Sequence, residues 1–244
     1  MIIDINCDVG EGIENEYLLM PYISSCNIAC GGHFGTAKTI DETVRLAIKN
    51  NVLIGAHPSF PDKENFGRKV MNISFQQLQD SIENQLNLFV ERLSFFGAKL
   101  HHIKPHGALY NLIAVDKSYA EVFIKSIKKY SKTTFLYVPF NSVIEKIAIK
   151  NNIKIKYEVF ADRNYNDNLT LVSRSENNAL IIDKSQVFNH VFYMLKNKKV
   201  KTISGIEKII QGDTFCIHGD TKNAVEIAKY LSEKLKKECV KIGA

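Results

Sequence analysis

The sequence contains no cysteine pattern of the kind that marks a disulfide framework or a thiolate zinc site. Its five cysteines are an odd number, and none forms a CxxC pair with another. This usage predicts a reducing compartment. The first residues carry no basic region, and no apolar stretch is long enough to span a bilayer. We therefore expect a cytoplasmic protein that has no membrane segment.

Motifs for nucleotides and nucleic acids are also missing. The chain has neither a glycine-rich dinucleotide motif after its first predicted strand nor a Walker-type GxxxxGK[ST] sequence. Its formal charge of +6 comes from 32 basic and 26 acidic residues, and the lysines are scattered along helix-like segments. Phe75, Phe89 and Phe95 follow a helical pattern that is typical of a core. A solvated cationic surface is therefore expected, with no nucleic-acid partner.

Length and hydrophobic content favour one domain. With 244 residues, 45% of them hydrophobic, the chain can bury a full-sized core but is short for two ordinary enzyme domains. No linker, low-complexity tract or clear internal repeat divides it. We predict that residues 1–244 form a single catalytic domain.

Short apolar runs alternate with longer amphipathic segments. The predicted strands are Met1–Ile5, Val52–Ala56, Phe135–Val138, Ile155–Phe160 and Thr214–Ile217. The predicted helices are Thr39–Asn50, Ser74–Phe96, Asp116–Tyr130, Asn141–Asn151, Ser185–Lys196 and Lys222–Lys237. In the second helix, Ser74 and Gln77 form a capping box and Gly97 ends the segment.

This alternation indicates an α/β fold in which helices lie outside a largely parallel sheet. The length fits a closed barrel of seven or eight βα units or an open doubly wound sheet. We predict the barrel, because polar motifs follow several strands rather than one crevice. Side chains placed after different strands would then converge on one rim.

The first polar motif is NCDVGEG, residues 6–12. It places two carboxylates, Asp8 and Glu11, three residues apart beside glycines that let the backbone approach a ligand. The structural alternative is an Asp-Gly turn with solvated acids.

Two histidines stand in comparable motifs. His33 ends SCNIACGGH, residues 25–33, and His57 stands at a strand end in GAHPS, residues 55–59. Either imidazole is suited to bind a metal or carry a proton, although a hydrogen-bonded structural histidine is the commoner case. Asp8, His33 and His57 together would supply two imidazoles and a carboxylate with open positions, which suits a hydrolytic divalent metal.

The segment HHIKPHGALYN, residues 101–111, concentrates a cation, three imidazoles, a phenol and an amide. Lys104 is suited to neutralise a carboxylate or phosphate, and His106 to act as general acid or base. His101 and His102 are adjacent in a predicted strand and must point to opposite faces. At most one of them faces the same way as Lys104, and we place neither in the site.

Two later motifs, EVFADRNY at 158–165 and CIHGD at 216–220, complete the set. Asp162 and Arg163 belong either to the site or to a structural ion pair, and Asp220 either joins the site or caps a helix that begins near Thr221. The joint pattern favours a site, because ionisable residues after different barrel strands converge on one rim.

These motifs resemble those of the LamB/YcsF family from Asp4 to about Ala224. The family motifs DxNCDxGEG, SxNIACGxH, GAHPSxPD, FGR, KPHGALYN, EVFADRxY and HGD stand at residues 4–12, 25–33, 55–62, 66–68, 104–111, 158–165 and 218–220. Seven motifs in the same order make the resemblance specific.

The resemblance implies a distorted (β/α) barrel related to the glycoside hydrolase and polysaccharide deacetylase fold. It also implies a part in the ATP-coupled opening of 5-oxo-L-proline to L-glutamate by a 5-oxoprolinase, in which this chain would be the A subunit and the B and C subunits its partners. Mg²⁺ would accompany ATP, and the nucleotide would bind this chain, a partner or their interface. The sequence leaves a homo-oligomer open.

The candidate site residues fall into two sets. The catalytic candidates are Asp8, Glu11, Lys104, His106, Asp162 and His218. The substrate- or phosphate-binding candidates are Asn6, Asn27, His57, Arg68, Tyr110, Arg163 and Asp220. The expected base is one of the two carboxylates in the first motif, and the expected proton donor to the leaving nitrogen is His106 or His218. Lys104 and Arg163 are expected to hold carboxylate or phosphate oxygens.

The chain departs from the family pattern at three places. Thr36 stands where the family usually has Asp, and Lys69 stands where a second Arg usually follows FGR. Asp167 and Asn168 replace an expected DG. We expect the reaction class to be unchanged.

Two other functions fit the same residues. One is a stand-alone, metal-dependent amidohydrolase or deacetylase that uses Asp8, His33 and His57. The other is a noncatalytic subunit that presents substrate to its partners. ATP-independent hydrolysis with a stoichiometric metal would indicate the first, and tolerance of single substitutions with retained binding would indicate the second.

Overall fold

Seven parallel strands close into a barrel. In the computed structural model, which describes residues 1–243, their order is β1 (Ile2–Val9), β2 (Ser25–Ala29), β3 (Leu53–His57), β4 (His102–Ile103), β5 (Phe135–Pro139), β6 (Ile155–Phe160) and β9 (Thr214–His218). Pairing of β9 with β1, from Asp4 opposite Thr214 to Asp8 opposite His218, closes the ring. The predicted α/β barrel is therefore confirmed.

Three short strands lie outside this ring. Strand β10 (Lys241–Ile242) pairs in parallel with the start of β1. Strands β7 (Lys199–Lys201) and β8 (Glu207–Ile209) form a separate antiparallel hairpin that the sequence did not predict.

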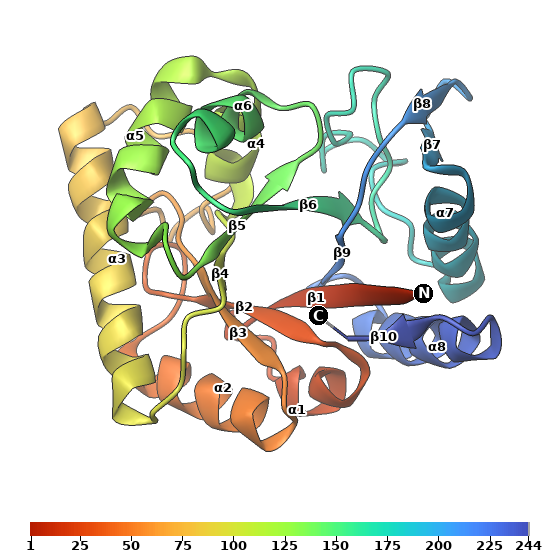
Figure 1. The fold of residues 1–244 in the computed structure, drawn as a ribbon, viewed down its shortest axis with the longest axis horizontal. Coiled ribbons are helices and arrows are strands. Elements are labelled where there is room, and N and C mark those ends of the chain that lie inside the picture. The colour runs from red at the N-terminus through yellow and green to blue at the C-terminus, as the bar shows by residue number, and fades with distance from the viewer. Residues whose placement is uncertain (244) are drawn as a thin grey trace.

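Helices cover the outside of the barrel. They are α1 (Glu16–Leu19), α2 (Ala37–Lys49), α3 (Phe75–Phe95), α4 (Gly107–Val115), α5 (Lys117–Ile127), α6 (Val143–Lys150), α7 (Lys184–Asn197) and α8 (Ala224–Lys237), with 3₁₀ turns at Met20–Tyr22 and Lys128–Tyr130. Figure 1 shows α3 and α5 along one side of the strands and α7 and α8 along the other. Within the described range, every helix is too short or too polar to cross a membrane.

Helix α3 forms where the sequence predicts it. The Ser74 hydroxyl accepts a hydrogen bond from the Gln77 backbone, and the Gln77 side chain accepts one from the Ser74 backbone, which confirms the capping box. Phe89 is buried in the core as expected. Phe75 and Phe95, however, are 47% and 70% exposed, so their prediction as core residues is wrong. They are the first and last residues of the helix and lie beyond its packed face.

The barrel interior is polar because of the alternation in β1. Apolar side chains at positions 3, 5, 7 and 9 alternate with Asp4, Asn6 and Asp8, and all seven are buried. Asp4 accepts hydrogen bonds from the hydroxyls of Ser25 and Tyr137 on other strands. The polar set therefore faces the barrel interior, and the apolar set packs beneath the helices.

This polar interior corrects the predicted end of the first strand. The apolar run ends at Ile5, but β1 continues to Val9. Asn6 and Asp8 consequently lie on the strand itself rather than after it. Polar residues that face a polar interior interrupt an apolar run without ending a strand.

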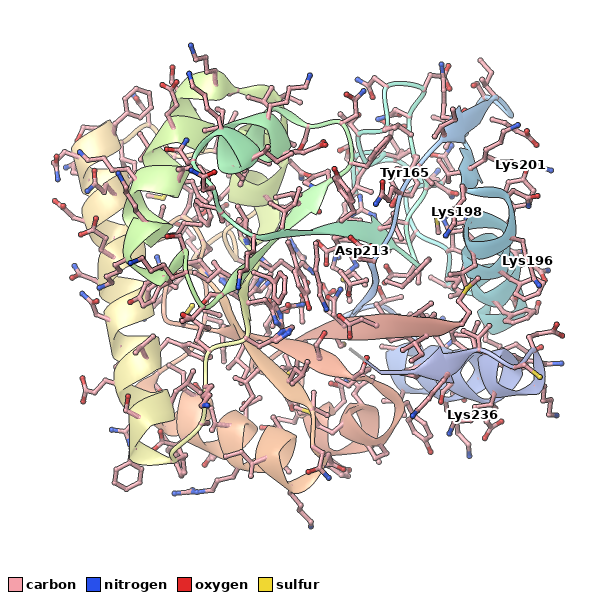
Figure 2. All side chains as sticks on the ribbon, in the orientation of Figure 1. Tyr165, Lys196, Lys198, Lys201, Asp213 and Lys236 are labelled. Carbon is pink, nitrogen blue, oxygen red and sulfur yellow. The ribbon has the colours of Figure 1, made fainter. Side chains whose placement is uncertain are left out.

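Basic side chains lie at the periphery of the molecule. Figure 2 shows Lys196, Lys198 and Lys201 around α7 and β7 at the outer edge, and Lys236 on α8. All four are exposed. Their positions agree with the predicted solvated cationic surface.

Candidate active site

A cavity of about 470 Å³ lies at the carboxyl end of the barrel strands. Its buried lining includes Asp8, His57, Lys104 and His106, which stand on or after three different strands. His218, at the end of β9, lines the same cavity. Convergence of the sequence motifs on one rim is thus observed.

Asp8 is held as a carboxylate at the end of β1. The backbone register places it opposite Asn27 on β2 and His218 on β9. Its Oδ1 atom accepts hydrogen bonds from Asn27 Nδ2 at 2.7 Å and Lys104 Nζ at 2.8 Å. Burial raises the pKa of Asp8, but interactions with His57 and Lys104 lower it well below its usual range. Asp8 is therefore charged at neutral pH.

The Lys104 ammonium is used entirely within the protein. Its Nζ lies 2.8 Å from Asp8 Oδ1, 3.0 Å from Glu158 Oε1 and 3.0 Å from Cys216 Sγ. Burial lowers the pKa of Lys104, but these neighbours, Asp8 foremost, raise it well above its usual value. An ammonium group has three hydrogens, and these three acceptors, together with Asn6 Oδ1 at 3.4 Å, are enough to engage all of them. Lys104 therefore holds Asp8 in place.

His57 and His106 face each other across the cavity floor. His57 Nε2 lies 3.0 Å from His106 Nδ1 and 3.5 Å from Asp8 Oδ2. On the far side of each ring, His57 Nδ1 donates to the Lys104 carbonyl at 2.7 Å and His106 Nε2 donates to the Phe66 carbonyl at 2.9 Å. Both rings are thus fixed in orientation by backbone acceptors.

The close approach of two loops positions His106. Gly107 begins α4 with φ at +57°, and a Cβ atom there would lie 2.6 Å from the Gly67 carbonyl oxygen. Glycine at this position lets the loop that carries Phe66 and Arg68 pack against His106. The same approach brings Arg68 to the cavity.

Glu11 and His33 form a second pair beside this one. Glu11 Oε1 accepts a hydrogen bond from His33 Nε2 at 2.8 Å and lies 3.2 Å from His106 Nδ1. The His33 and His106 rings stack with centroids 3.7 Å apart. Burial raises the pKa of Glu11, but interactions with His106 and His33 lower it below its usual range. Burial lowers the pKa of His33 to about 4, which keeps this ring neutral.

Asp162 orients His218 on the other side of the cavity. This fully buried carboxylate follows β6 and accepts hydrogen bonds from the His218 backbone at 3.0 Å, from His218 Nδ1 at 2.9 Å and from Thr221 Oγ1 at 2.6 Å. Although burial raises the pKa of Asp162, its interactions with His218 lower it to about 2. Asp162 holds Nδ1 of His218 and leaves Nε2 available for chemistry.

Arg163 is largely committed to the fold. Its guanidinium donates to the backbone carbonyls of Val172 and Ala179, which fixes the segment that follows β6. It lines the cavity but is 5% exposed. The alternative of an Asp162–Arg163 ion pair does not describe the structure, because Asp162 pairs with His218.

Cationic side chains surround the more exposed part of the cavity. Arg68 and Arg174 both pair with Asp220, and Lys69 also lines this part. Burial raises the pKa of Asp220, but Arg174 and the other neighbouring cations lower it. Asp220 is not a helix cap, since α8 begins after Asn223. Two arginines share one carboxylate, which leaves a net positive charge at this rim. The rim is therefore suited to bind an anionic group.

Three of the predicted binding residues lie at different depths. Tyr110 lines the cavity, and burial together with the Glu158 carboxylate raises its pKa well above its usual value. Asn6 and Asn27 lie deeper: Asn6 Nδ2 donates to Glu158 at 3.0 Å, and Asn27 Nδ2 donates to Asn6 Oδ1 at 2.7 Å. The two asparagines support the site from below.

Sequence reasoning missed three residues of this network. Glu158 lies on β6 within a recognised motif but was not selected. The sequence places His102 outside the site, yet its Nε2 lies 2.7 Å from Asn27 Oδ1 and its ring stacks on Tyr137. The signal was its spacing of two residues from Lys104, which places both on one face of a strand. Arg174 carried no sequence signal, because it lies in an irregular segment.

Three groups of side chains bring suitable ligand atoms close enough to hold a metal. In residues 1–243 these are Asp8, His57 and His106; Glu11, His33 and His106; and Asp8, Cys216 and His218. The predicted set of Asp8, His33 and His57 is not one of them. His33 pairs with Glu11 instead, and His106 takes its place beside Asp8 and His57.

One departure from the family pattern has a structural explanation. Thr36 is the N-cap of α2, where it forms a capping box with Thr39. Asp and Thr both serve as N-caps, so the helix start is kept. Lys69 lines the cavity, and Asp167 accepts hydrogen bonds from Thr202 and Ser204.

Named relatives match this chain along nearly its whole length. A protein from Campylobacter jejuni strain 81-176, named as the A subunit of 5-oxoprolinase, is 39% identical, covering 99% of this chain and 97% of the relative. A protein of the same name from Bacillus cereus strain B4264 is 37% identical, covering 99% and 98%.

Solved structures agree with the fold. The lactam utilization protein from Thermus thermophilus superposes with a TM-score of 0.93 at 33% identity and full coverage of both chains. A family 4 carbohydrate esterase from Streptomyces lividans, with a TM-score of 0.50 at 12% identity, covers 100% of this chain and 92% of its own, and shares the fold alone. The LamB/YcsF family model matches residues 3–244. This chain belongs to the LamB/YcsF family.

Proposed function

We propose that this chain is the lactam-opening subunit of a 5-oxoprolinase, which converts 5-oxo-L-proline, ATP and water to L-glutamate, ADP and phosphate. The observation that carries the proposal is one cavity in which buried Asp8, His57 and His106 stand opposite a rim with Arg68 and Arg174. Acid–base groups and anion-binding groups are thus available to one small ligand. The names of the full-length relatives support the same reaction.

The chemistry explains why ATP is needed. A five-membered lactam is a resonance-stabilised amide, and water attacks it slowly. Phosphorylation of the lactam oxygen by ATP makes the carbon a better electrophile. Water then adds as a base takes its proton, and the C–N bond breaks as the ring nitrogen gains a proton. A second water releases phosphate from the resulting acyl phosphate and leaves L-glutamate.

The geometry favours particular residues for these proton transfers. A carboxylate at the buried end, Asp8 or Glu11, takes the proton from water. His218 gives a proton to the leaving nitrogen, because Asp162 holds its Nδ1 and leaves Nε2 available. His106 is less suited to this step, since its Nε2 donates to the Phe66 carbonyl and its Nδ1 faces His57 Nε2 at 3.0 Å.

The rim provides for the phosphoryl group. Arg68, Lys69 and Arg174 line the more exposed part of the cavity, and Asp220 neutralises only part of their charge. Guanidinium groups bind phosphate oxygens with directional, charge-assisted hydrogen bonds. A phosphorylated lactam would therefore place its phosphoryl group at this rim and its carbon near the buried carboxylates.

The proposed reaction requires ATP and partner chains. The sequence has no phosphate-loop motif, so we assign ATP with Mg²⁺ to the B or C subunits or to an interface with them.

Four of the five cysteines are buried as free thiols, which supports a reducing compartment such as the cytoplasm.

The test is release of glutamate and phosphate from 5-oxoproline and ATP by this chain with its candidate B and C subunits, omitting each in turn. Equal release of both products only in the full mixture is the expected result. No release in any mixture of folded subunits would overturn the proposal.

A stand-alone hydrolase is the second candidate, favoured by the cluster of Asp8, His57 and His106. It would open a lactam or another amide without ATP and without partners. Hydrolysis by the isolated chain that continues when ATP is omitted would select this candidate over the first.

A further inference from the structure

The hydrogen-bond partners of two histidines determine where their protons lie. His57 Nδ1 lies 2.7 Å from the Lys104 carbonyl oxygen, and His106 Nε2 lies 2.9 Å from the Phe66 carbonyl oxygen. A carbonyl oxygen only accepts, so both of these nitrogens carry hydrogen. In the neutral rings, the remaining nitrogens, His57 Nε2 and His106 Nδ1, each carry a lone pair. These two nitrogens are only 3.0 Å apart.

Two carboxylates approach the same point. Asp8 Oδ2 lies 3.5 Å from His57 Nε2, and Glu11 Oε1 lies 3.2 Å from His106 Nδ1 and 3.9 Å from His57 Nε2. All four residues are at most 5% exposed. When both rings are neutral, four electron-rich atoms therefore converge in a buried place with no hydrogen between them, an arrangement that is repulsive unless a cation lies among them.

The charges around this point are also unbalanced. Asp8 and Glu158 both contact the ammonium of Lys104, whereas buried Glu11 contacts the imidazoles of His33 and His106. When these three carboxylates are ionised and the imidazoles are neutral, Lys104 balances only one of the three negative charges. Buried charge is costly unless it is paired or coordinates a metal. A divalent cation supplies the missing charge.

We propose that Asp8 Oδ2, His57 Nε2 and His106 Nδ1 bind one divalent transition-metal ion of the Zn²⁺ class. Atoms about 2.0–2.2 Å from a common ion are separated by distances similar to the 3.0 and 3.5 Å observed here. Two imidazoles and one carboxylate suit Zn²⁺ and its neighbours better than Mg²⁺ or Ca²⁺. The backbone carbonyls behind both imidazoles are typical partners of metal-bound histidines.

The metal site has consequences for the other residues. Asp8 becomes a ligand, and Glu11, held by His33, becomes the proposed base. Because Asp8, His57 and His106 line the cavity, the ion would keep an open position toward substrate. When bound, it would polarise a carbonyl oxygen or lower the pKa of a water molecule.

A neighbouring group, Asp8, Cys216 and His218, is less suited to bind the metal ion than Asp8, His57 and His106. Burial raises the pKa of the Cys216 thiol well above its usual value, and Lys104 Nζ lies 3.0 Å from its sulfur. His218 Nδ1 is already bonded to Asp162. These contacts make His218, which lines the same cavity, and buried Cys216 useful as controls.

The experiment measures binding without turnover, so its result is independent of the proposed reaction. The full chain carrying Cys239→Ser, which removes the one exposed thiol, is treated with EDTA and titrated with Zn²⁺ by calorimetry and with Co²⁺ by absorption. We expect one ion per chain and a rise in the thermal unfolding temperature on adding Zn²⁺. His57→Gln and His106→Asn should each weaken binding by about 100-fold or more.

Cys216→Ser and His218→Gln are the matched controls, and both should bind Zn²⁺ within about 10-fold of the parent. Loss of binding in these controls with retention in His106→Asn would overturn the assignment. The EDTA-treated parent chain also tests it without any variant. If that folded chain binds neither ion more tightly than about 1 mM, the proposal fails and the facing imidazoles share a proton instead.

Discussion

Lys104 Nζ joins two carboxylates from different strands, Asp8 Oδ1 at 2.8 Å and Glu158 Oε1 at 3.0 Å. All three side chains are buried. Replacing Lys104 with Met keeps the volume but leaves both carboxylates without their cation. Loss of one partner in a buried ionic group costs about 3–5 kcal/mol. We expect Lys104→Met to lower the free energy of unfolding by about this amount, measured by urea unfolding at pH 7.

A double variant separates lost charge compensation from lost packing. Lys104→Met combined with Glu158→Gln removes the ammonium and one of the carboxylates it neutralises. This pair should be more stable than Lys104→Met alone. A single variant as stable as the parent, or a double variant no better than the single, would contradict the described role of Lys104.

Asp8→Asn tests the buried end of the cavity. The change preserves shape, and Lys104 retains its contact with Glu158. We expect the unfolding transition to remain cooperative while glutamate release in the complete three-subunit mixture falls by about 10²–10⁴-fold. Circular dichroism checks the fold. Near-normal glutamate release would rule out Asp8 as the base.

The sequence predicts the barrel because strand and helix periodicities are local. It also predicts that Asp8, His57 and His106 meet, because they stand on or after neighbouring parallel strands. The sequence does not predict that the imidazoles of His57 and His106 face each other. That arrangement depends on the close approach of Gly107 to Gly67, and these two glycines are far apart in the chain. Asp8, His33 and His57 are not one of the groups whose ligand atoms lie together, because Glu11, on another loop, contacts the Nε2 atom of His33.

Polar residues inside strands account for other differences. The apolar run predicts a first strand that ends at Ile5, because Asn6 and Asp8 are polar. They alternate with buried Cys7 and Val9, and this period of two is the signal of a strand with a polar inner face. Arg174 had no such signal, because an irregular segment places it against Asp220.

Arg174→Ala tests the proposed anion-binding rim. Charge-assisted hydrogen bonds to the phosphoryl group of the phosphorylated lactam contribute enough that their loss should lower kcat/KM for 5-oxoproline by roughly 10-fold or more in the complete mixture. Arg92→Ala is the matched control, because Arg92 also pairs with a carboxylate, Asp41, but does not line the cavity. Its kcat/KM should be unchanged. Equal kcat/KM values for the two variants would remove the rim from the proposed site.

The Asp162 carboxylate makes stability depend on pH. Its hydrogen bonds with His218 and Thr221 help to lower its pKa from 3.8 to about 2 in the folded state. The folded protein therefore binds this proton less tightly than the unfolded chain does. The resulting stabilisation is present above pH 4 and is lost as the pH falls toward 2. A shift of this size corresponds to about 2 kcal/mol.

Asp162→Asn isolates this contribution. At pH 7 the variant should be less stable than the parent, and the difference in free energy of unfolding should narrow by about 2 kcal/mol between pH 5 and pH 2. Guanidinium unfolding at several pH values measures it. Asp80→Asn, at an exposed carboxylate on α3, is the control and should show a small difference that varies little with pH. A parent–variant difference for Asp162 that stays constant over this range would mean that the carboxylate contributes through shape and hydrogen bonding rather than through its charge.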